Sequence, residues 1–301
     1  SILWANTASV SGIHLRNEIS STPVLSYCCV SGGYAGTGNI SSEPIFVDST
    51  NDDYRLRVNS PCKDSGTAVG SPILDIEGNI RDLNPDMGAY EYTTTNRPAC
   101  IWRVDHSATG TNNGTSWTNA FASLQSALSV ALSGDEIWVA AGTYTPTTAN
   151  GDRYISFVIP NGVKLYGGFS GNELSLSGRN IKSSHTILSG DLNNNDGVSW
   201  PPLQSLINDN SFHVVRPRSD SVIDGFIIER GNANDTSTTN WYERNGAGVF
   251  GYQAHYVLKN CIIRFNSAEE NGAGIIVCYY SAIIENCRSE EHTSELQSRQ
   301  V

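Results

Sequence analysis

The chain has 301 residues, a length that predicts about two domains. Its 30 Asp and Glu residues outnumber its 19 Lys and Arg residues, and the formal net charge of -11 excludes the basic surface that nucleic-acid binding requires. Charged residues make up only 16% of the chain, so Ser, Thr, Asn and Gly supply its solubility, as is typical of β-rich extracellular proteins. The longest apolar stretch, 275–284, is about half as long as a membrane span. We therefore expect no membrane-spanning helix in this sequence.

In chain order, the first predicted element is a strand at residues 1–4 (SILW). Residues 93–100 are polar and include a proline, which predicts a linker. Segment 119–133 then shows helical periodicity, because apolar side chains fall at i, i+3, i+7 and i+11: Phe121, Leu124, Leu128 and Leu132. In a solenoid, a fold made of stacked coils of β-strands, an amphipathic helix ahead of the first coil covers the strand edge whose backbone groups would otherwise be unpaired. We expect 119–133 to be such a cap.

The sequence between residues 224 and 275 contains an internal repeat. Residues 245–249 (NGAGV) recur as 271–275 (NGAGI), an offset of 26, and residues 224–228 match 259–263 at an offset of 35. The difference of nine residues indicates an inserted loop around 235–244. Each unit holds short β-branched runs between Gly and Asn, with no room for a helix. The pattern predicts an all-β fold, a parallel β-helix, in which successive coils stack at about 4.8 Å.

Stacking would bring equivalent residues of neighbouring coils into columns. Phe226, Cys261 and Cys287 are expected to share one inward column, while Asn260 and Asn286 would start an asparagine ladder at a turn. The seven cysteines are odd in number and form no C-x-x-C pair, so neither zinc nor a regular disulfide framework is indicated. Cys261 and Cys287 would lie within reach of a disulfide. Free small hydrophobic thiols remain the other interpretation.

The chain resembles known bacterial surface proteins on particular motifs. Residues 101–287 resemble the capped first part of a right-handed parallel β-helix domain of pectin lyase-like fold; the motifs are 112–117 (NNGTSW), 137–144 (IWVAAGTY), 166–169 (YGGF), 188–191 (LSGD) and 224–226 (DGF). Residues 1–92 resemble the closing coils and tail of proteins labelled choice-of-anchor Q; the motifs are 1–6 (SILWAN), 43–48 (EPIFVD), 54–56 (YRL), 60–62 (SPC) and 86–91 (DMGAYE). The resemblance implies the end of one β-helix domain, the linker 93–100, and the start of a second.

The C-terminus differs in character from the rest. Residues 288–298 read RSEEHTSELQS, which is similar to the translation of a widely used sequencing adapter. We therefore expect 288–301 to be a non-native tail on a metagenome-like fragment.

Two polar segments are candidates for sites. Residues 191–197 (DLNNNDG) carry oxygen side chains, as a Ca²⁺ loop would; the candidate ligands are Asp191, Asn193, Asn195 and Asp196. Gly197 comes one place later than in the EF-hand pattern, and Pro202 occupies the position of its closing Glu. A Ca²⁺ loop and a solvated loop are both open at this stage.

The second polar segment lies near the end of the first domain. Arg81 is expected to pair with Asp86 or Glu91 and to hold the tail against the last coil. The charges favour a structural cap over catalysis, because a single pairing of this kind accounts for them.

No catalytic constellation emerges from the motifs. The expected function is a non-catalytic scaffold or adhesive module at the bacterial cell surface or outside the cell, with polysaccharides or cell-surface glycans as partners and a monomeric state when intact. One alternative is a polysaccharide lyase or glycoside hydrolase whose active coils lie outside this sequence. A calcium-stabilised surface module is the other. No cofactor is predicted, and Ca²⁺ is the one ion considered.

Overall fold

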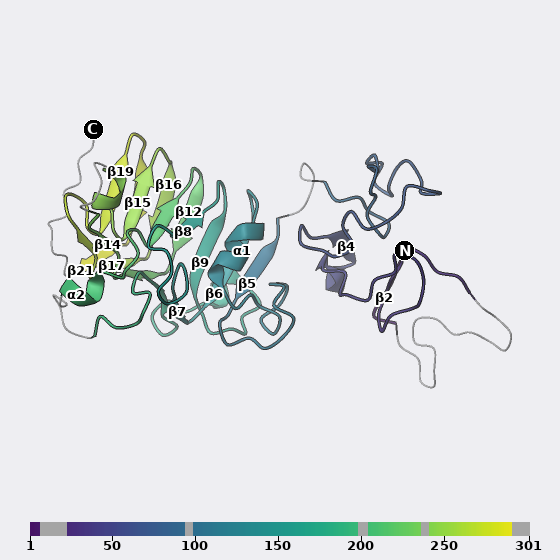
Figure 1. Ribbon diagram of the computed structural model, residues 1–301, viewed down its shortest axis with the longest axis horizontal. Coiled ribbons are helices and arrows are strands. Elements are labelled where there is room, and N and C mark those ends of the chain that lie inside the picture. The colour runs from purple at the N-terminus through teal and green to yellow at the C-terminus, as the bar shows by residue number, and fades with distance from the viewer. Residues whose placement is uncertain (7–22, 94–98, 198–203, 236–240, 291–301) are drawn as a thin grey trace. The chain divides into compact units, whose positions relative to one another are not determined.

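The computed structural model describes residues 1–6, 23–93, 99–197, 204–235 and 241–290. The chain divides into two compact units, Ser1–Pro98 and Ala99–Val301 (Figure 1). The division falls within the segment 93–100 that the sequence predicts as a linker. The structure is mostly β, and no helix in the described part of the chain is long and apolar enough to cross a bilayer.

Three parallel sheets build the second unit. The first sheet is formed, in spatial order, by β5 (Ile101–Val104), β6 (Glu136–Ala140), β9 (Lys164–Phe169), β12 (Ser221–Asp224), β16 (Tyr256–Lys259) and β20 (Ala282–Glu285). The second holds β7 (Gly142–Tyr144), β10 (Thr186–Ser189), β13 (Ile227–Glu229), β17 (Ile262–Arg264) and β21 (Arg288–Glu290). The third holds β8 (Phe157–Ile159), β11 (Val215–Pro217), β15 (Val249–Tyr252) and β19 (Ile275–Cys278).

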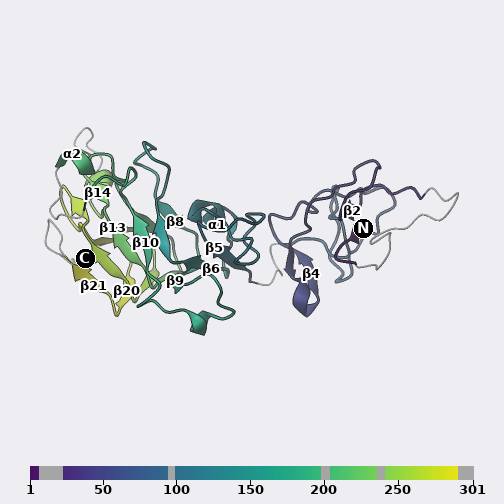
Figure 2. The same ribbon diagram turned by 90° about the horizontal axis from the view of Figure 1, so that it is seen from below.

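The chain visits these sheets in turn, so strands close in space are one coil apart in sequence (Figures 1 and 2). A further short parallel pair joins β14 (Asn232–Ala233) to β18 (Ser267–Ala268). Stacked parallel strands of this kind are consistent with a β-solenoid. The parallel pairing expected from the repeats is confirmed.

The register of the strands follows the sequence repeats. Asp224 pairs with Lys259, at the offset of 35, and Lys259 pairs with Glu285, at the offset of 26. Inward columns form as expected, and the apolar side chains that fill one of them are fully buried: Ile137, Leu165, Ile223 and Leu258. Phe226 and Cys261 stack in another inward column and are each 1% exposed. Periodic apolar residues thus form a continuous core.

Residues at one turn of each coil adopt left-handed backbone. Gly225, Asn260 and Asn286 occupy equivalent positions with φ of 87°, 51° and 52°. Gly and Asn tolerate this conformation better than other residues, which explains why Asn recurs there. The Asn260 amide, however, donates to Asp224 at 2.8 Å. The amide-to-amide bond between coils forms elsewhere, from Asn271 to Asn245 at 3.0 Å.

The cap helix is shorter than predicted. Helix α1 covers Leu124–Val130, not 119–133, and packs against β5, β6 and β8. Phe121 does not join the helix because it forms a parallel bridge instead: its backbone N–H donates to the Arg103 carbonyl, and its own carbonyl accepts from the N–H of Asp105. A second helix, α2 (Gln204–Ile207), was not expected.

A buried carboxylate holds the first coil of the second unit. Asp135 is fully buried and accepts hydrogen bonds from the backbone N–H groups of Cys100 and Leu132 and from Nε1 of Trp102. Cys100, which the sequence places in the linker, is itself buried in this unit. A carboxylate with three donors tolerates burial far better than an unpaired one.

The first unit has little regular structure. A two-residue parallel pair joins β1 (Ile2–Leu3) to β2 (Cys29–Val30), with Ile40 bridging onto Cys29. An antiparallel hairpin follows, formed by β3 (Phe46–Asp48) and β4 (Asp53–Leu56) around the 3₁₀ turn η1 (Ser49–Asn51). That residues 1–92 are the closing coils of a β-helix therefore stays a prediction.

The predicted non-native tail begins inside the described structure. Its first residues form β21, which continues the ladder on β17. Residues 291–301 lie outside the described residues. The origin of 288–301 stays a prediction.

Candidate functional site

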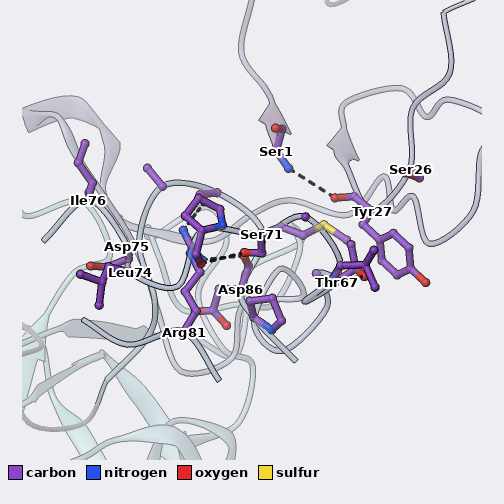
Figure 3. A pocket seen from close by; sticks show the side chains of 18 residues that line it. Ser1, Ser26, Tyr27, Thr67, Ser71, Leu74, Asp75, Ile76, Arg81 and Asp86 are labelled. Carbon is purple, nitrogen blue, oxygen red and sulfur yellow. Dashed lines mark hydrogen bonds between the residues drawn. The ribbon is translucent and has the colours of Figure 1, made fainter. Parts of the chain in front are cut away.

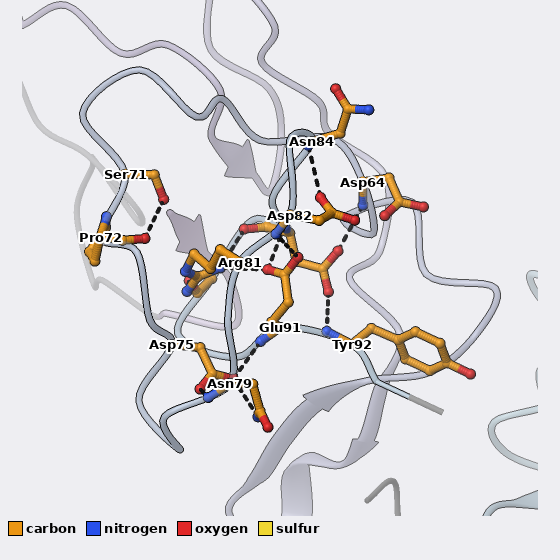
Figure 4. A network of polar contacts seen from close by, with 12 residues as sticks. Asp64, Ser71, Pro72, Asp75, Asn79, Arg81, Asp82, Asn84, Glu91 and Tyr92 are labelled. Atoms are coloured by element: carbon orange, nitrogen blue, oxygen red, sulfur yellow. Dashed lines mark hydrogen bonds and ion pairs between the residues drawn. The ribbon is translucent and has the colours of Figure 1, made fainter. Parts of the chain in front are cut away.

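Arg81 lies at the centre of a polar network in the first unit (Figure 4). Its guanidinium pairs with Glu91 at 3.0 Å, and both side chains are at least nine-tenths buried. The same group donates to the carbonyl oxygens of Asp86 and Gly88. Of the two pairings considered from sequence, the ion pair joins Arg81 to Glu91, and Asp86 takes part through its backbone.

The carboxylates around Arg81 serve the backbone. Asp86 accepts from the N–H groups of Asp64 and Tyr92 at 2.8 and 2.6 Å, and Glu91 accepts from the N–H of Asp86. Burial raises the pKa of Asp86 to about 6, outweighing those two amide hydrogen bonds. These bonds tie residues 64–92 together, which is a structural task.

A pocket of about 530 Å³ adjoins this network (Figure 3). Tyr27 lies at one end and Leu74 with Ile76 at the other, while Arg81 and Asp86 line the part between them. Both charged residues are already bonded within the network described above. Little charge is therefore left for a ligand. A smaller pocket of about 310 Å³ in the second unit includes Lys182, His185 and Asn260 in its wall.

Three acceptor oxygens of the candidate Ca²⁺ loop, on Asp191 and Asn193, are occupied by backbone N–H groups, whereas Oδ1 of Asp196 has no hydrogen-bond partner among the described residues. The two carboxylate oxygens of Asp191 accept from the backbone N–H groups of Asn195 and Asp196 at 3.1 and 3.2 Å. The side-chain oxygen of Asn193 accepts from the N–H of Asn150 at 2.8 Å. These oxygens organise the loop and its neighbour.

The remaining side chains of that loop face charged partners. Both Asn193 and Asn195 donate their amide groups to Asp209. Asp196 pairs with Arg230 at 3.3 Å. Across the residues whose placement is described, no group of three or more His, Cys, Asp or Glu side chains is arranged to hold a metal ion.

Two pairs of opposite charges lie on the lateral faces of the coils. Lys259 pairs with Glu285 at 2.8 Å and Arg264 with Glu229 at 2.7 Å, in both cases across neighbouring coils. Alternation of sign along a column therefore stabilises the stack. None of these pairs leaves a carboxylate aimed at an open site.

The third sheet carries a row of aromatic rings on its outer side. We call Trp241, Tyr242, Tyr252 and Tyr279 the aromatic row. Neighbouring ring centroids are 6.0, 5.0 and 5.2 Å apart, each pair edge to face. The outermost rings are the most exposed, with Trp241 at 38% and Tyr279 at 74%. Hydrogen bonding to Tyr242 raises the pKa of Tyr252 to about 12.

Strand register and an inserted turn together position these rings. Tyr252 ends β15, and its register partner Cys278 ends β19, so Tyr279 follows one coil further along. The other two rings come from the inserted loop, where η3 (Tyr242–Arg244) folds back over the sheet. The row thus spans neighbouring coils and includes the insertion.

Beneath the row lies a buried aromatic base. Phe250 points outward on β15 yet is only 1% exposed, because Trp241 and Tyr242 cover it. His213 stacks on it at 4.5 Å, and burial lowers the pKa of His213 to about 3, which keeps the ring neutral. The guanidinium of Arg216 lies 5.4 Å from the Phe250 ring centre, a cation–π contact. A packed base holds the exposed rings in place.

One buried carboxylate lies next to the row. Glu243 in η3 is 9% exposed, and its Oε2 has no hydrogen-bond partner among the residues described. Burial raises the pKa of this group. Asp235, bonded to the hydroxyl of Tyr154 at 3.0 Å, donates its backbone N–H to the Glu243 carbonyl.

The sequence did not point to this aromatic surface. The inserted loop was recognised from the change in repeat length, and insertions in repeat proteins collect on one face that often binds ligands. That the insertion brings Trp241 and Tyr242 beside Tyr252 depends on how it folds back, which no periodicity encodes.

Comparison with known proteins finds one family. Residues 107–288 match the sequence model of the family DUF1565, whose description is 'protein of unknown function'. Neither the curated proteins nor the solved structures contain a match. Because the matched stretch covers more than half of the sequence, the chain belongs to the DUF1565 family.

Proposed function

We propose that the second unit is the start of a right-handed parallel β-helix that serves as an extracellular scaffold and binds neutral glycans on the aromatic row. The observation that carries this proposal is the row itself, four neighbouring rings on one outer face with Tyr279 74% exposed. Exposed aromatic clusters of this kind are uncommon on surfaces that bind nothing.

The chemistry of the row suits sugar rings. A pyranose presents apolar C–H groups on its faces and hydroxyl groups at its rim. Tyr and Trp provide rigid apolar area together with a polar O–H or N–H group. Since a packed base of Phe250 and His213 supports the row, little conformational entropy is lost when a ligand binds.

Charge favours a neutral partner. The formal net charge is -11. Polyanionic glycans would be repelled, especially at low salt. A neutral, extended polysaccharide avoids that cost and matches a row that crosses coils.

The test measures binding of the full chain to a panel of immobilised glycans. The neutral members are cellulose, xylan, mannan and starch, and polygalacturonate represents the anionic class. We expect retention on at least one neutral glycan and weaker retention on polygalacturonate. Tyr279→Ala and Trp241→Ala should each weaken the retained interaction about 10-fold, since aromatic anchors contribute on the order of 1–2 kcal/mol.

The matched control is Tyr54→Ala, which removes an exposed tyrosine (45%) from the hairpin of the first unit. This variant should bind as the wild type does. Absence of binding to every neutral glycan, or equal binding by all three variants, would contradict the proposal.

A second candidate, glycoside hydrolysis, is favoured by Glu243 alone. A buried carboxyl with a raised pKa beside a sugar-binding surface is suited to act as a general acid. The same glycan panel tests it by the release of reducing ends. Product formation that Glu243→Gln abolishes would favour the enzyme, whereas binding without product favours the scaffold.

A further inference from the structure

The core of the first unit holds two cysteines side by side. Cys29 lies in β2, Cys62 follows the β3–β4 hairpin, and both side chains are 0% exposed. The Cys29 thiol donates to the carbonyl of Ser42 at 3.2 Å, and the interaction between the two thiols lowers the pKa of Cys29 and raises that of Cys62. Leu56 and Met87 pack around them in one apolar cluster. A disulfide requires the two sulfurs to approach to about 2.05 Å.

Neighbouring cysteine Cys28 shows that this placement is specific. Cys28 directly precedes β2, so its thiol has different surroundings from those of Cys29. Cys29 points into the core, whereas Cys28 is half-buried and donates its thiol to the carbonyl of Ser26. The first unit therefore directs one of these two adjacent thiols toward Cys62.

We propose that Cys29 and Cys62 form a disulfide bond in the mature protein. The thiolate of one cysteine attacks a low-molecular-mass disulfide, RSSR, which releases one RSH and leaves a mixed disulfide. The second cysteine then displaces the other RSH and forms the Cys29–Cys62 bond. Overall the two thiols lose two protons and two electrons, and RSSR is reduced to two RSH.

Burial determines when this exchange takes place. With both sulfurs fully enclosed, RSSR reaches them only before the core closes. Once folded, the bond is shielded from reductants. A bridge here closes the chain across the hairpin and limits the unfolded ensemble of a unit with few backbone ladders.

The experiment refolds the full chain in a mixture of glutathione and glutathione disulfide, so it does not depend on the proposed location or function. Free thiols are alkylated, and tryptic peptides are mapped by mass without reduction. We expect peptide 58–63, which contains Cys62, to be linked to peptide 17–55, which contains Cys28 and Cys29. Cys28→Ala should keep this link, and Cys29→Ala should remove it.

Thermal unfolding gives a second readout. Addition of a reductant during thermal unfolding should lower the Tm of the first unit by about 10 °C. The same reductant should not change the Tm of a Cys29→Ala/Cys62→Ala double variant. Recovery of Cys62 in its alkylated, unlinked form from the wild type would overturn the proposal. Persistence of the link in Cys29→Ala would do the same. The wild-type map decides the question even where a variant does not fold.

Discussion

The two units of this protein are held together in different ways. In the second unit, each strand bonds to a neighbour one coil away, and the same apolar column runs from Ile137 to Leu258. The first unit has one parallel pair and one hairpin among its described residues. It relies instead on side chains that bond to the backbone, above all around Arg81.

This difference has an energetic consequence. A stacked unit distributes its stability over many equivalent contacts, so losing one side chain affects the neighbouring coils. A unit organised around one buried ion pair depends on both of its members, because removing the charge of one residue leaves the opposite charge buried without a counter-charge.

The largest effect is expected for Arg81→Ala. This change leaves the buried Glu91 carboxylate unpaired and the carbonyls of Asp86 and Gly88 without their donor. We expect a loss of about 4 kcal/mol, confined to the first unit and measured by chemical denaturation with fluorescence and hydrogen exchange.

The matched control for this change is Arg55→Ala. Arg55 pairs with Asp53 at 2.7 Å, but both side chains are partly exposed, so the loss should be below about 1 kcal/mol. Equal effects of the two changes would contradict the central role of Arg81.

In the second unit, Ile223→Ala should cost about 3 kcal/mol. Ile223 is fully buried between Leu165 and Leu258 of the neighbouring coils, and deletion of a buried aliphatic side chain leaves a cavity. Val222→Ala, on the outer face of the same strand, is the control and should cost under about 1 kcal/mol. Denaturant titration of both variants checks the prediction, and a reversed order would refute the inward column.

A smaller effect is expected at the turn. Asn260→Ala forces a side chain that disfavours φ of 51° into that conformation and removes the bond to Asp224. We expect a loss of about 2 kcal/mol. Asn260→Gly keeps the backbone preference and should lose about half as much. A glycine variant less stable than the alanine variant by thermal unfolding would rule out the conformational explanation.

The smallest effect concerns pH. The pKa of Asp86 is raised to about 6 by burial, so the folded unit binds this proton more tightly than the unfolded chain does. The resulting stability is present below the ordinary carboxyl pKa near 3.8 and is lost as the pH rises to 6. After solvent screening it amounts to about 1 kcal/mol.

Asp86→Asn isolates this contribution, since all other titrating groups remain. The difference in Tm between wild type and variant should change between pH 4 and pH 6 and stay constant above that range. A difference that does not vary with pH would show that Asp86 titrates in the same way in both states.

Where residues repeat, the sequence predicted the structure closely. The offsets of 26 and 35 gave the strand register, and the inward positions of Phe226 and Cys261 followed from it. The pairing of Arg81 with Glu91 was also among the interpretations, since the charges lie close together in sequence. Helix boundaries were less accurate, because Phe121 bonds to a strand instead of extending α1.

The residue repeats are enough to predict that the second unit is built from stacked parallel strands, because each coil repeats the residues that the next coil must match. Outside that repetition, the packing of the chain brings particular groups together. The aromatic row depends on how an insertion folds back onto β15, and Cys29 meets Cys62 through a core that closes around both. Such contacts join residues that no common period relates, so three-dimensional packing alone brings them together.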